Sequence, residues 1–343
     1  MRRIVLLPFS WIYSLVLTIR HWLYDVGLKG VTHFEKPVIV VGNLSLGGSG
    51  KTPHTIYLSE LLRHFNPIIL SRGYGRKTKG FRWVLSTDTH AISGDEPILM
   101  KRVLQDIPVA VCESRVEGIE RIIQEKDPGV ILLDDAFQHR KLRAGFSILL
   151  IEYSSFSKPR LLVPAGKERD LWKRRNNANV VMITKCPEYI DNDNKLSIES
   201  SLKLINSTPV FFSTLRYGTI RNFIGEEISD VQLIQMHLIL VTGIANPDLL
   251  VKELSQKSTL VHTFQFADHY QFKKGDIEMI KQNSIKFAKG RRTLFITTSK
   301  DRVRIEPLLL EEEKSVWIEI PLTIEIDEAE KFNEIIENYV RTN

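Results

Sequence analysis

The residue types most suited to phosphate binding stand in a glycine-rich segment at residues 42–53. This segment follows an apolar run at residues 38–41 and precedes a helical pattern, so a strand, a turn and a helix are expected. Glycines let backbone N–H groups converge on phosphate oxygens, and the start of a helix adds partial positive charge. The residues predicted to form this phosphate cradle are Gly47, Gly48, Ser49 and Gly50.

Two side chains at the start of the expected helix complete this chemistry. Lys51 is expected to reach the β- and γ-phosphates of a nucleotide, and the Thr52 hydroxyl is a natural ligand for Mg²⁺. The strict pattern has a glycine five residues before Gly50, whereas Ser45 stands there. An ordinary glycine-rich turn is the alternative, but the strand and helix on either side favour nucleotide binding.

Two adjacent carboxylates, Asp134 and Asp135, follow an apolar run at residues 130–133. An acidic residue at the end of such a strand is where phosphate-loop enzymes hold Mg²⁺, directly or through water. The alternative is an aspartate pair that caps a helix. A metal site is favoured because the amide, imidazole and guanidinium of residues 138–140 follow in the same short segment. The residues alone do not separate the roles of the two aspartates.

Asp95 is a further candidate, in the segment Gly94-Asp95-Glu96-Pro97. This position suits the N-cap of a helix that begins near Pro97. It equally suits a carboxylate that orients and deprotonates an attacking hydroxyl, because phosphoryl transfer depends mainly on positioning and charge neutralisation. Spacing alone leaves both interpretations open.

Cationic side chains stand near the expected ends of two other strands. The loop at residues 71–77 carries Arg72, Arg76 and Lys77, which suit phosphate on a nucleotide or an acceptor, or simply solvent. Arg115 opens a helix, where capping and anion binding compete. His269 follows an aspartate in an expected loop, and is either structural or part of a site.

The nucleotide is predicted to be ATP. Residues 184–187 end an expected strand at the point where GTPases place Asn-Lys-x-Asp, but here they read Thr-Lys-Cys-Pro. The aspartate that recognises guanine is therefore absent, with Pro187 in its position.

Apolar runs alternate with helical patterns from residue 37 onward, and these elements position the candidate residues. The runs are near-continuous in Val, Ile and Leu, which is typical of parallel strands buried on both faces. The pattern predicts an α/β fold, with a P-loop NTPase-like, doubly wound parallel sheet and ligands at the carboxyl ends of its strands. A second, smaller α/β domain is expected, with a cleft between the two as the site of a two-substrate reaction. The expected divisions are residues 1–28 (an N-terminal helix), 29–210 (the phosphate-loop domain), 211–230 (a hinge with short strands) and 231–343 (the smaller domain).

The N-terminal segment has an apolar stretch of sixteen uncharged residues, 4–19, after Arg2 and Arg3. As a helix it is about 24 Å long, shorter than a hydrocarbon core of about 30 Å. Its aromatic residues and flanking cations suit a membrane interface with anionic head groups, so a membrane-associated helix over residues 1–24 is favoured. A buried core helix and a signal peptide are the alternatives. No small-residue cleavage site follows, which disfavours the signal peptide.

Bulk composition narrows the classes of partner. The chain has 343 residues, a formal net charge of +6 and two cysteines, so it has no disulfide framework and suits an anionic partner. A nucleic-acid-binding protein is disfavoured because no aromatic and basic interleaving or known module is present. No obligate protein partner is indicated.

Taken together, these motifs resemble the tetraacyldisaccharide 4′-kinases of lipid A biosynthesis. The resemblance follows the family's order over nearly the whole chain, including the apolar N-terminal helix. The motifs that carry it lie at residues 41–53, 71–76, 94–97, 134–140, 164–166, 242–247 and 297–301. After Pro164-Ala165-Gly166 the family usually continues with Leu-Arg-Glu, whereas residues 167–170 here are Lys-Glu-Arg-Asp. The equivalence of Arg169 and Asp170 is therefore left open.

The resemblance implies an inner-membrane enzyme, with its active site on the cytoplasmic side, that uses Mg²⁺ and ATP. Its acceptor would be an anionic glycolipid, the 4′-hydroxyl of tetraacyldisaccharide 1-phosphate, giving lipid IVA. By the same resemblance Asp95 is the base, assisted by His269 across the cleft, and Lys51 acts on the phosphates. The residues implied around Mg²⁺ and the γ-phosphate are Thr52, Asp134, Asp135, Gln138 and His139. Those implied to line the phosphate or sugar region are Arg72, Tyr74, Lys77 and Arg115.

One alternative from another class remains at this point. A membrane-associated P-loop NTPase that acts as a switch or metallochaperone would share the phosphate loop but would have no acceptor substrate.

Overall fold

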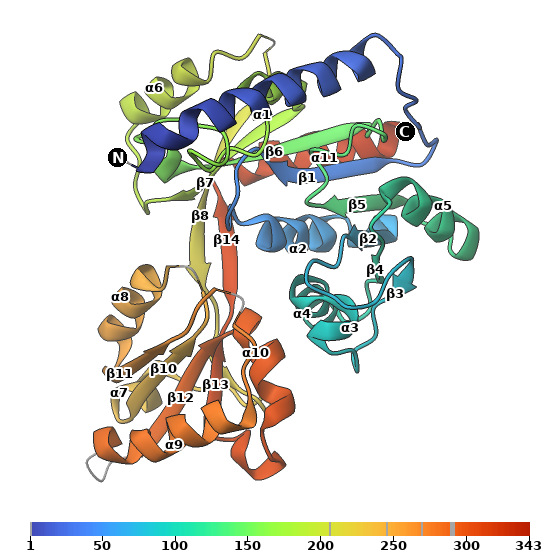
Figure 1. Cartoon of the computed structure of the whole chain (residues 1–343). Coiled ribbons are helices and arrows are strands. Elements are labelled where there is room, and N and C mark those ends of the chain that lie inside the picture. The colour runs from blue at the N-terminus through green and yellow to red at the C-terminus, as the bar shows by residue number, and fades with distance from the viewer. Residues whose placement is uncertain (1, 206, 245, 269, 289–291) are drawn as a thin grey trace.

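Two α/β units joined by a pair of strands make up the computed structural model (Figure 1). The structure describes residues 2–205, 207–244, 246–268, 270–288 and 292–343. Within these residues, the first unit has a nine-stranded sheet of order β14-β8-β7-β6-β1-β5-β2-β4-β3. The strands are β1 (Val38–Asn43), β2 (Pro67–Ser71), β3 (Arg82–Trp83), β4 (Val109–Val111), β5 (Val130–Asp134), β6 (Phe146–Glu152), β7 (Val180–Cys186), β8 (Val210–Tyr217) and β14 (Leu322–Ile326).

The strands from β8 to β4 in this order run parallel, and the edge strands β14 and β3 are antiparallel. Every residue of β1 and β5 is buried, because helices cover both faces of the sheet. One face packs on α2 (Lys51–Leu61), α4 (Asp95–Leu104) and α11 (Ala329–Thr342). The other packs on α5 (Arg115–Glu125) and α6 (Asn192–Leu202). The predicted α/β fold is confirmed.

The described part of the second unit has a five-stranded sheet of order β11-β10-β12-β13-β9. Its strands are β9 (Arg221–Asn222), β10 (His237–Thr242), β11 (Thr259–Gln265), β12 (Thr293–Thr298) and β13 (Trp317–Ile320). Its helices are α7 (Asp230–Ile234), α8 (Asp248–Lys257), α9 (Lys274–Ala288) and α10 (Ser299–Ile305). A short α3 (His90–Ser93) in the first unit precedes α4 and faces the second unit's side of the molecule (Figure 1).

The C-terminal segment lies in the first unit, which differs from the expected smaller domain of residues 231–343. β14 pairs antiparallel with β8, and α11 then packs on the large sheet, where Phe332 is 1% exposed. The Phe332 ring lies 5.3 Å from Phe211 and 6.3 Å from Tyr57. Residues 211–230, the expected hinge with short strands, contain most of β8, which pairs in the large sheet, and β9, which pairs in the second sheet. Local periodicity predicts such elements but not the sheet they join.

The N-terminal helix α1 (Arg2–Asp25) lies across the first unit (Figure 1). One stripe is buried and consists of Ser10, Leu17, His21 and Tyr24. The opposite face exposes large apolar side chains, among them Ile4, Phe9, Trp11, Leu15 and Trp22. Among the described residues, Ile4–Asp25 is a helix long and apolar enough to cross a membrane by length and composition. Because α1 is largely exposed, a wholly buried core helix does not describe it.

We expect Phe332→Ala to reduce the free energy of unfolding by about 3–5 kcal/mol, because it leaves a cavity between α11 and the sheet. The exposed Glu334→Ala on the same helix is the matched control and should change it by less than about 0.5 kcal/mol. Urea unfolding followed by circular dichroism measures both. Equal stability of the two variants would mean that α11 contributes nothing to the core of the first unit.

Candidate active site

The glycine-rich segment forms a loop between β1 and the start of α2. Gly50 occupies the N-cap of α2 with φ 84°, a left-handed conformation that glycine adopts without steric cost. A Cβ added at Gly47 or Gly48 would meet no atom within 4 Å, so the outer side of the loop is open. Two hydrogen bonds hold Ser49, one from Asn43 Nδ2 to its Oγ (2.8 Å) and one from Thr184 Oγ1 to its carbonyl (3.0 Å).

A buried histidine, His54, which the sequence analysis did not single out, holds the end of this loop by hydrogen bonds. His54 Nδ1 donates to the Gly50 carbonyl (2.7 Å), and its Nε2 lies 3.0 Å from Ser213 Oγ on β8. Burial lowers the pKa of His54 to about 4, so the ring is neutral. The phosphate loop is thereby connected to the strand that leads into the second unit.

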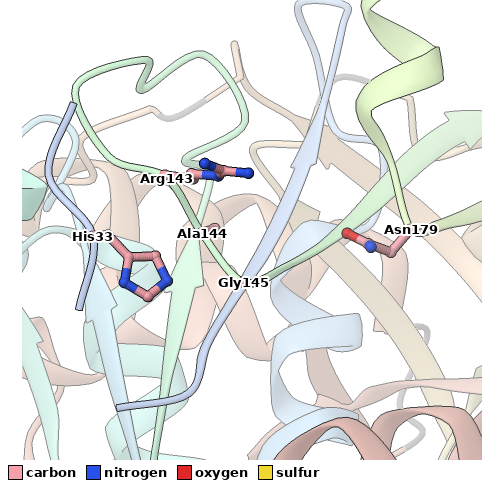
Figure 2. A pocket seen from close by; sticks show the side chains of 5 residues that line it. All are labelled: His33, Arg143, Ala144, Gly145 and Asn179. Atoms are coloured by element: carbon pink, nitrogen blue, oxygen red, sulfur yellow. The ribbon is translucent and has the colours of Figure 1, made fainter. Parts of the chain in front are cut away.

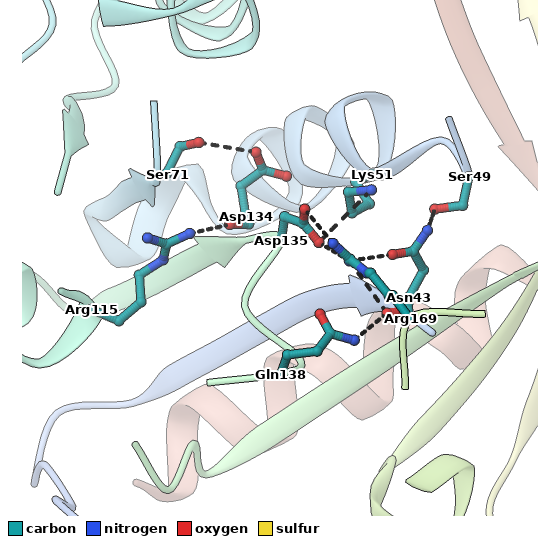
Figure 3. A network of polar contacts seen from close by, with 9 residues as sticks. All are labelled: Asn43, Ser49, Lys51, Ser71, Arg115, Asp134, Asp135, Gln138 and Arg169. Carbon is teal, nitrogen blue, oxygen red and sulfur yellow. Dashed lines mark hydrogen bonds and ion pairs between the residues drawn. The ribbon is translucent and has the colours of Figure 1, made fainter. Parts of the chain in front are cut away.

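Asp134 ends β5 beside the loop and is fully buried (Figure 3). Its Oδ2 accepts a hydrogen bond from Ser71 Oγ (3.2 Å), whereas its Oδ1 has no partner among the described residues. Burial, reinforced by the charges of Glu96 and Asp135, raises the pKa of Asp134 to about 7. A buried carboxylate oxygen without a partner is costly, and carboxylate oxygen is the ligand that Mg²⁺ prefers. The residues present therefore fit a divalent cation.

Asp135 adopts a left-handed φ of 53° and meets two cations. Its carboxylate lies 3.8 Å from Lys51 Nζ and forms an ion pair with Arg169, whose Nη1 donates at 3.1 Å. Burial alone would raise the pKa of Asp135, but the Arg169 hydrogen bond and the charge of Lys51 outweigh it and lower the pKa. The two adjacent aspartates thus have opposite pKa shifts, a difference that the sequence left unresolved.

Arg169, whose equivalence to the family motif the sequence left open, lies in this site. Besides Asp135, its guanidinium donates to the side chain of Asn43, and its backbone N–H donates to the Leu44 carbonyl (2.7 Å). Its own carbonyl accepts from Tyr13 on α1 (2.9 Å), and the neighbouring Asp170 lies 2.7 Å from His21. The signal that pointed to it is the motif at residues 164–166, which ends three residues earlier.

Three other predicted residues, Gln138, His139 and Arg115, lie close to this cluster. Gln138 Nε2 donates to the Asn43 carbonyl (2.7 Å), and Arg20 of α1 donates to the Gln138 carbonyl (3.0 Å). Burial, with the nearby Arg115 and Arg72 charges, lowers the pKa of His139 to about 4. Arg115 is 1% exposed and donates to the carbonyls of Cys112 (2.8 Å) and Asp134 (3.2 Å). Burial lowers its pKa to about 10.

The loop after β2 presents three predicted residues to the surface. Arg72, Tyr74 and Lys77 are exposed, and the Tyr74 side chain is 72% accessible. Arg76, in contrast, pairs with Glu113 at 2.8 Å and donates to the Gly80 carbonyl, so it fastens the loop to the first unit.

Asp95 lies where the two units meet. The helix α4 begins at Asp95 with Gly94 at the N-cap, so the carboxylate is not the N-cap group. Its Oδ2 accepts from Arg304 Nε on α10 of the second unit (2.9 Å). His269, the predicted assistant of Asp95, lies outside the described residues.

An open pocket elsewhere on the first unit is lined by His33, Arg143, Ala144, Gly145 and Asn179 (Figure 2). Gly145 and Asn179 come directly before β6 and β7. The pocket therefore lies at the amino ends of the parallel strands, opposite the edge that carries the phosphate loop and the aspartates.

The raised pKa of Asp134 predicts how the stability of the metal-free protein changes with pH. A carboxyl with a folded-state pKa above its unfolded value stabilises the fold at low pH, and this contribution is lost as pH rises through about 7. In EDTA, we expect the wild-type melting temperature to fall relative to that of Asp134→Asn between about pH 5 and about pH 8, by roughly 4 °C or more. Thermal scans across this range measure the difference. Parallel curves for the two proteins would contradict the assignment.

Comparisons with known proteins show the family and the fold of this chain. The family model described as tetraacyldisaccharide-1-P 4′-kinase matches residues 2–341. A tetraacyldisaccharide 4′-kinase from Bacteroides thetaiotaomicron is 39% identical, over 98% of this chain and 93% of the relative. One from Flavobacterium johnsoniae is 37% identical, over 99% and 98%. A crystal structure of LpxK from Aquifex aeolicus in complex with ATP matches 99% of this chain and 100% of its own with a TM-score of 0.79 at 28% identity. The chain belongs to the tetraacyldisaccharide-1-P 4′-kinase family.

Proposed function

We propose that this protein transfers the γ-phosphate of magnesium-bound ATP to the 4′-hydroxyl of tetraacyldisaccharide 1-phosphate, giving lipid IVA. Family membership supports the reaction class. The observation that carries the proposal is the placement of Lys51 and the open loop at residues 47–50 directly beside the Asp134–Asp135 pair.

In this proposal the first unit binds the nucleotide. The loop amides and the start of α2 offer N–H donors and partial positive charge to the phosphates. The Lys51 ammonium lies 3.8 Å from the Asp135 carboxylate. When a nucleotide binds in the adjacent loop, Lys51 would turn from this carboxylate to a phosphate oxygen. A closely placed lysine would then neutralise charge that develops during transfer.

The metal would be held by Asp134, whose Oδ1 has no hydrogen-bond partner among the described residues, together with Thr52 in the first turn of α2. Such an ion supplies charge neutralisation on the phosphates. Asp135 is kept ionised by Lys51 and Arg169, so it would add negative charge to the same side of the site.

The acceptor would enter between the two units. Asp95 is proposed as the base that takes the proton of the 4′-hydroxyl, and His269 as its assistant. The exposed Arg72, Tyr74 and Lys77 surround the same side of the first unit and, with Arg115 behind them, are proposed to contact the phosphorylated acceptor. Cationic and aromatic side chains suit an anionic sugar.

The acyl chains of the acceptor lie in a membrane, so the enzyme must bind at a lipid surface. The exposed apolar face of α1 is suited to contact that surface. Its exposed face carries Trp11, Leu15 and Trp22, whereas its buried face binds the segment that holds Arg169. We infer that α1 associates with the cytoplasmic side of the inner membrane.

Replacement of the proposed machinery should stop label transfer from radiolabelled ATP to the glycolipid. We expect Lys51→Ala and Asp95→Asn each to lower kcat by about 10²-fold or more, with ATP binding retained in Asp95→Asn because that carboxylate is proposed to act on the acceptor hydroxyl and not on the nucleotide. The exposed Lys126→Ala is the control and should keep wild-type turnover. Full activity of Asp95→Asn would exclude it as the base. ATP hydrolysis without lipid labelling in the wild type would instead indicate a switch-type NTPase.

The two faces of α1 should respond differently to substitution. The double variant Trp11→Ser and Leu15→Ser should weaken sedimentation with anionic vesicles by about tenfold or more, because it removes apolar area from the exposed face. It should keep the melting temperature. His21→Leu should keep vesicle binding but lose roughly 1–3 kcal/mol of stability, because it removes the side-chain partner of the buried Asp170. Unchanged vesicle binding in the double variant would count against the membrane role.

A further inference from the structure

The charged contact between α4 and α10 joins the proposed base to the second unit. Arg304 on α10 is 2% exposed, and Asp95 at the start of α4 is 7% exposed. Both Nε and Nη2 of Arg304 donate to the same carboxylate oxygen, Asp95 Oδ2, with Nε at 2.9 Å. Two charged donors that converge on one oxygen restrain where that oxygen lies relative to the second unit.

Arg304 itself is held rigidly by its own unit. Its Nη1 donates to Asp301 Oδ1 at 3.2 Å, one turn earlier on α10. Asp301 is fully buried, and its Oδ2 accepts from Thr242 Oγ1 (2.9 Å), Gly243 N (3.1 Å) and Thr298 Oγ1 (2.9 Å). These donors lie at the carboxyl ends of β10 and β12. The guanidinium is therefore fixed to the framework of the second sheet.

We propose that Arg304 is a positioning residue that orients the Asp95 carboxylate, so that this carboxylate is correctly aimed only when the second unit is docked on the first. The inference rests on the proposed role of Asp95 as base. Arg304 acts through Asp95 and has no assigned contact with either substrate. A catalytic carboxylate displaced by about 1 Å loses much of its effect, which is why such a restraint matters for turnover.

A second ion pair at the same interface offers a matched control. Arg102 on α4 pairs with Glu306, which directly follows α10. Arg102→Gln removes a charged contact between α4 and the residue that follows α10, and it leaves the Arg304–Asp95 contact in place. A loss caused merely by weaker docking of the units should appear equally in Arg102→Gln and Arg304→Gln.

The experiment compares kcat and KM for ATP in Arg304→Gln, Arg304→Lys and Arg102→Gln, with the full-length protein and tetraacyldisaccharide 1-phosphate in mixed micelles. We expect Arg304→Gln to lower kcat by about 10–100-fold with KM for ATP within about twofold, because the phosphate loop is untouched. Arg304→Lys should recover about tenfold of this loss, since lysine keeps the charge but not the two-donor geometry. Arg102→Gln should lose less than about threefold. Equal losses in Arg304→Gln and Arg102→Gln would overturn the proposal.

A double-mutant cycle tests whether Arg304 acts through Asp95. In the double variant Asp95→Asn and Arg304→Gln both side chains of the pair are neutral, so no unpaired buried charge remains at Asp95 to disturb folding. In the Asp95→Asn background, Arg304→Gln should cost less than about twofold further, because the carboxylate that it orients is absent. A full additional loss there would overturn the positioning role. The proposed function has a separate outcome: if Asp95→Asn alone keeps activity, the base assignment fails whatever Arg304→Gln does.

Discussion

The balance of charge around Asp134 and Asp135 is the constraint on which the rest of the site depends. Two adjacent carboxylates are taken out of water at the end of β5, which is costly unless cations or donors compensate them. Asp135 is compensated by Lys51 and Arg169, and its pKa is lowered. Asp134 is compensated less, and its pKa is raised to about 7. This asymmetry leaves one buried oxygen suited to a cation and keeps the lysine of the phosphate loop close to the same point.

Three distant parts of the chain converge to keep that balance. Arg169 comes from a segment that α1 fastens through Tyr13 and His21, so the N-terminal helix is a support of the site as well as a candidate membrane contact. His54 fastens the loop from the other side and reaches β8. A helix with one hydrogen-bonded face and one apolar exposed face can serve both purposes, because the two faces use different side chains.

The second unit is connected to the first in two ways. β8 and β14 link the two units covalently and pair with each other. In addition, α4 contacts α10 through the buried Asp95–Arg304 pair, and Arg102 of α4 forms a partly exposed ion pair with Glu306, which follows α10. Buried ion pairs contribute little net stability, because desolvation offsets much of the attraction, but they specify geometry. A contact of this kind suits an interface whose orientation, more than its strength, determines where a carboxylate points.

Sequence alone determined the features that depend on local pattern: the parallel α/β class, the loop before Lys51, the aspartates at a strand end and the apolar helix at the N-terminus. Each of these features depends on residues that are close together in the sequence, such as an apolar run or a glycine spacing, and can therefore be recognised without the fold. Only the tertiary structure decided that residues 322–342 return to the first unit, that Arg169 pairs with Asp135 and that Arg304 reaches Asp95. These contacts join residues from 34 to 209 positions apart. Such pairings leave no periodic trace, because each depends on how whole elements pack and on which buried charge needs a partner.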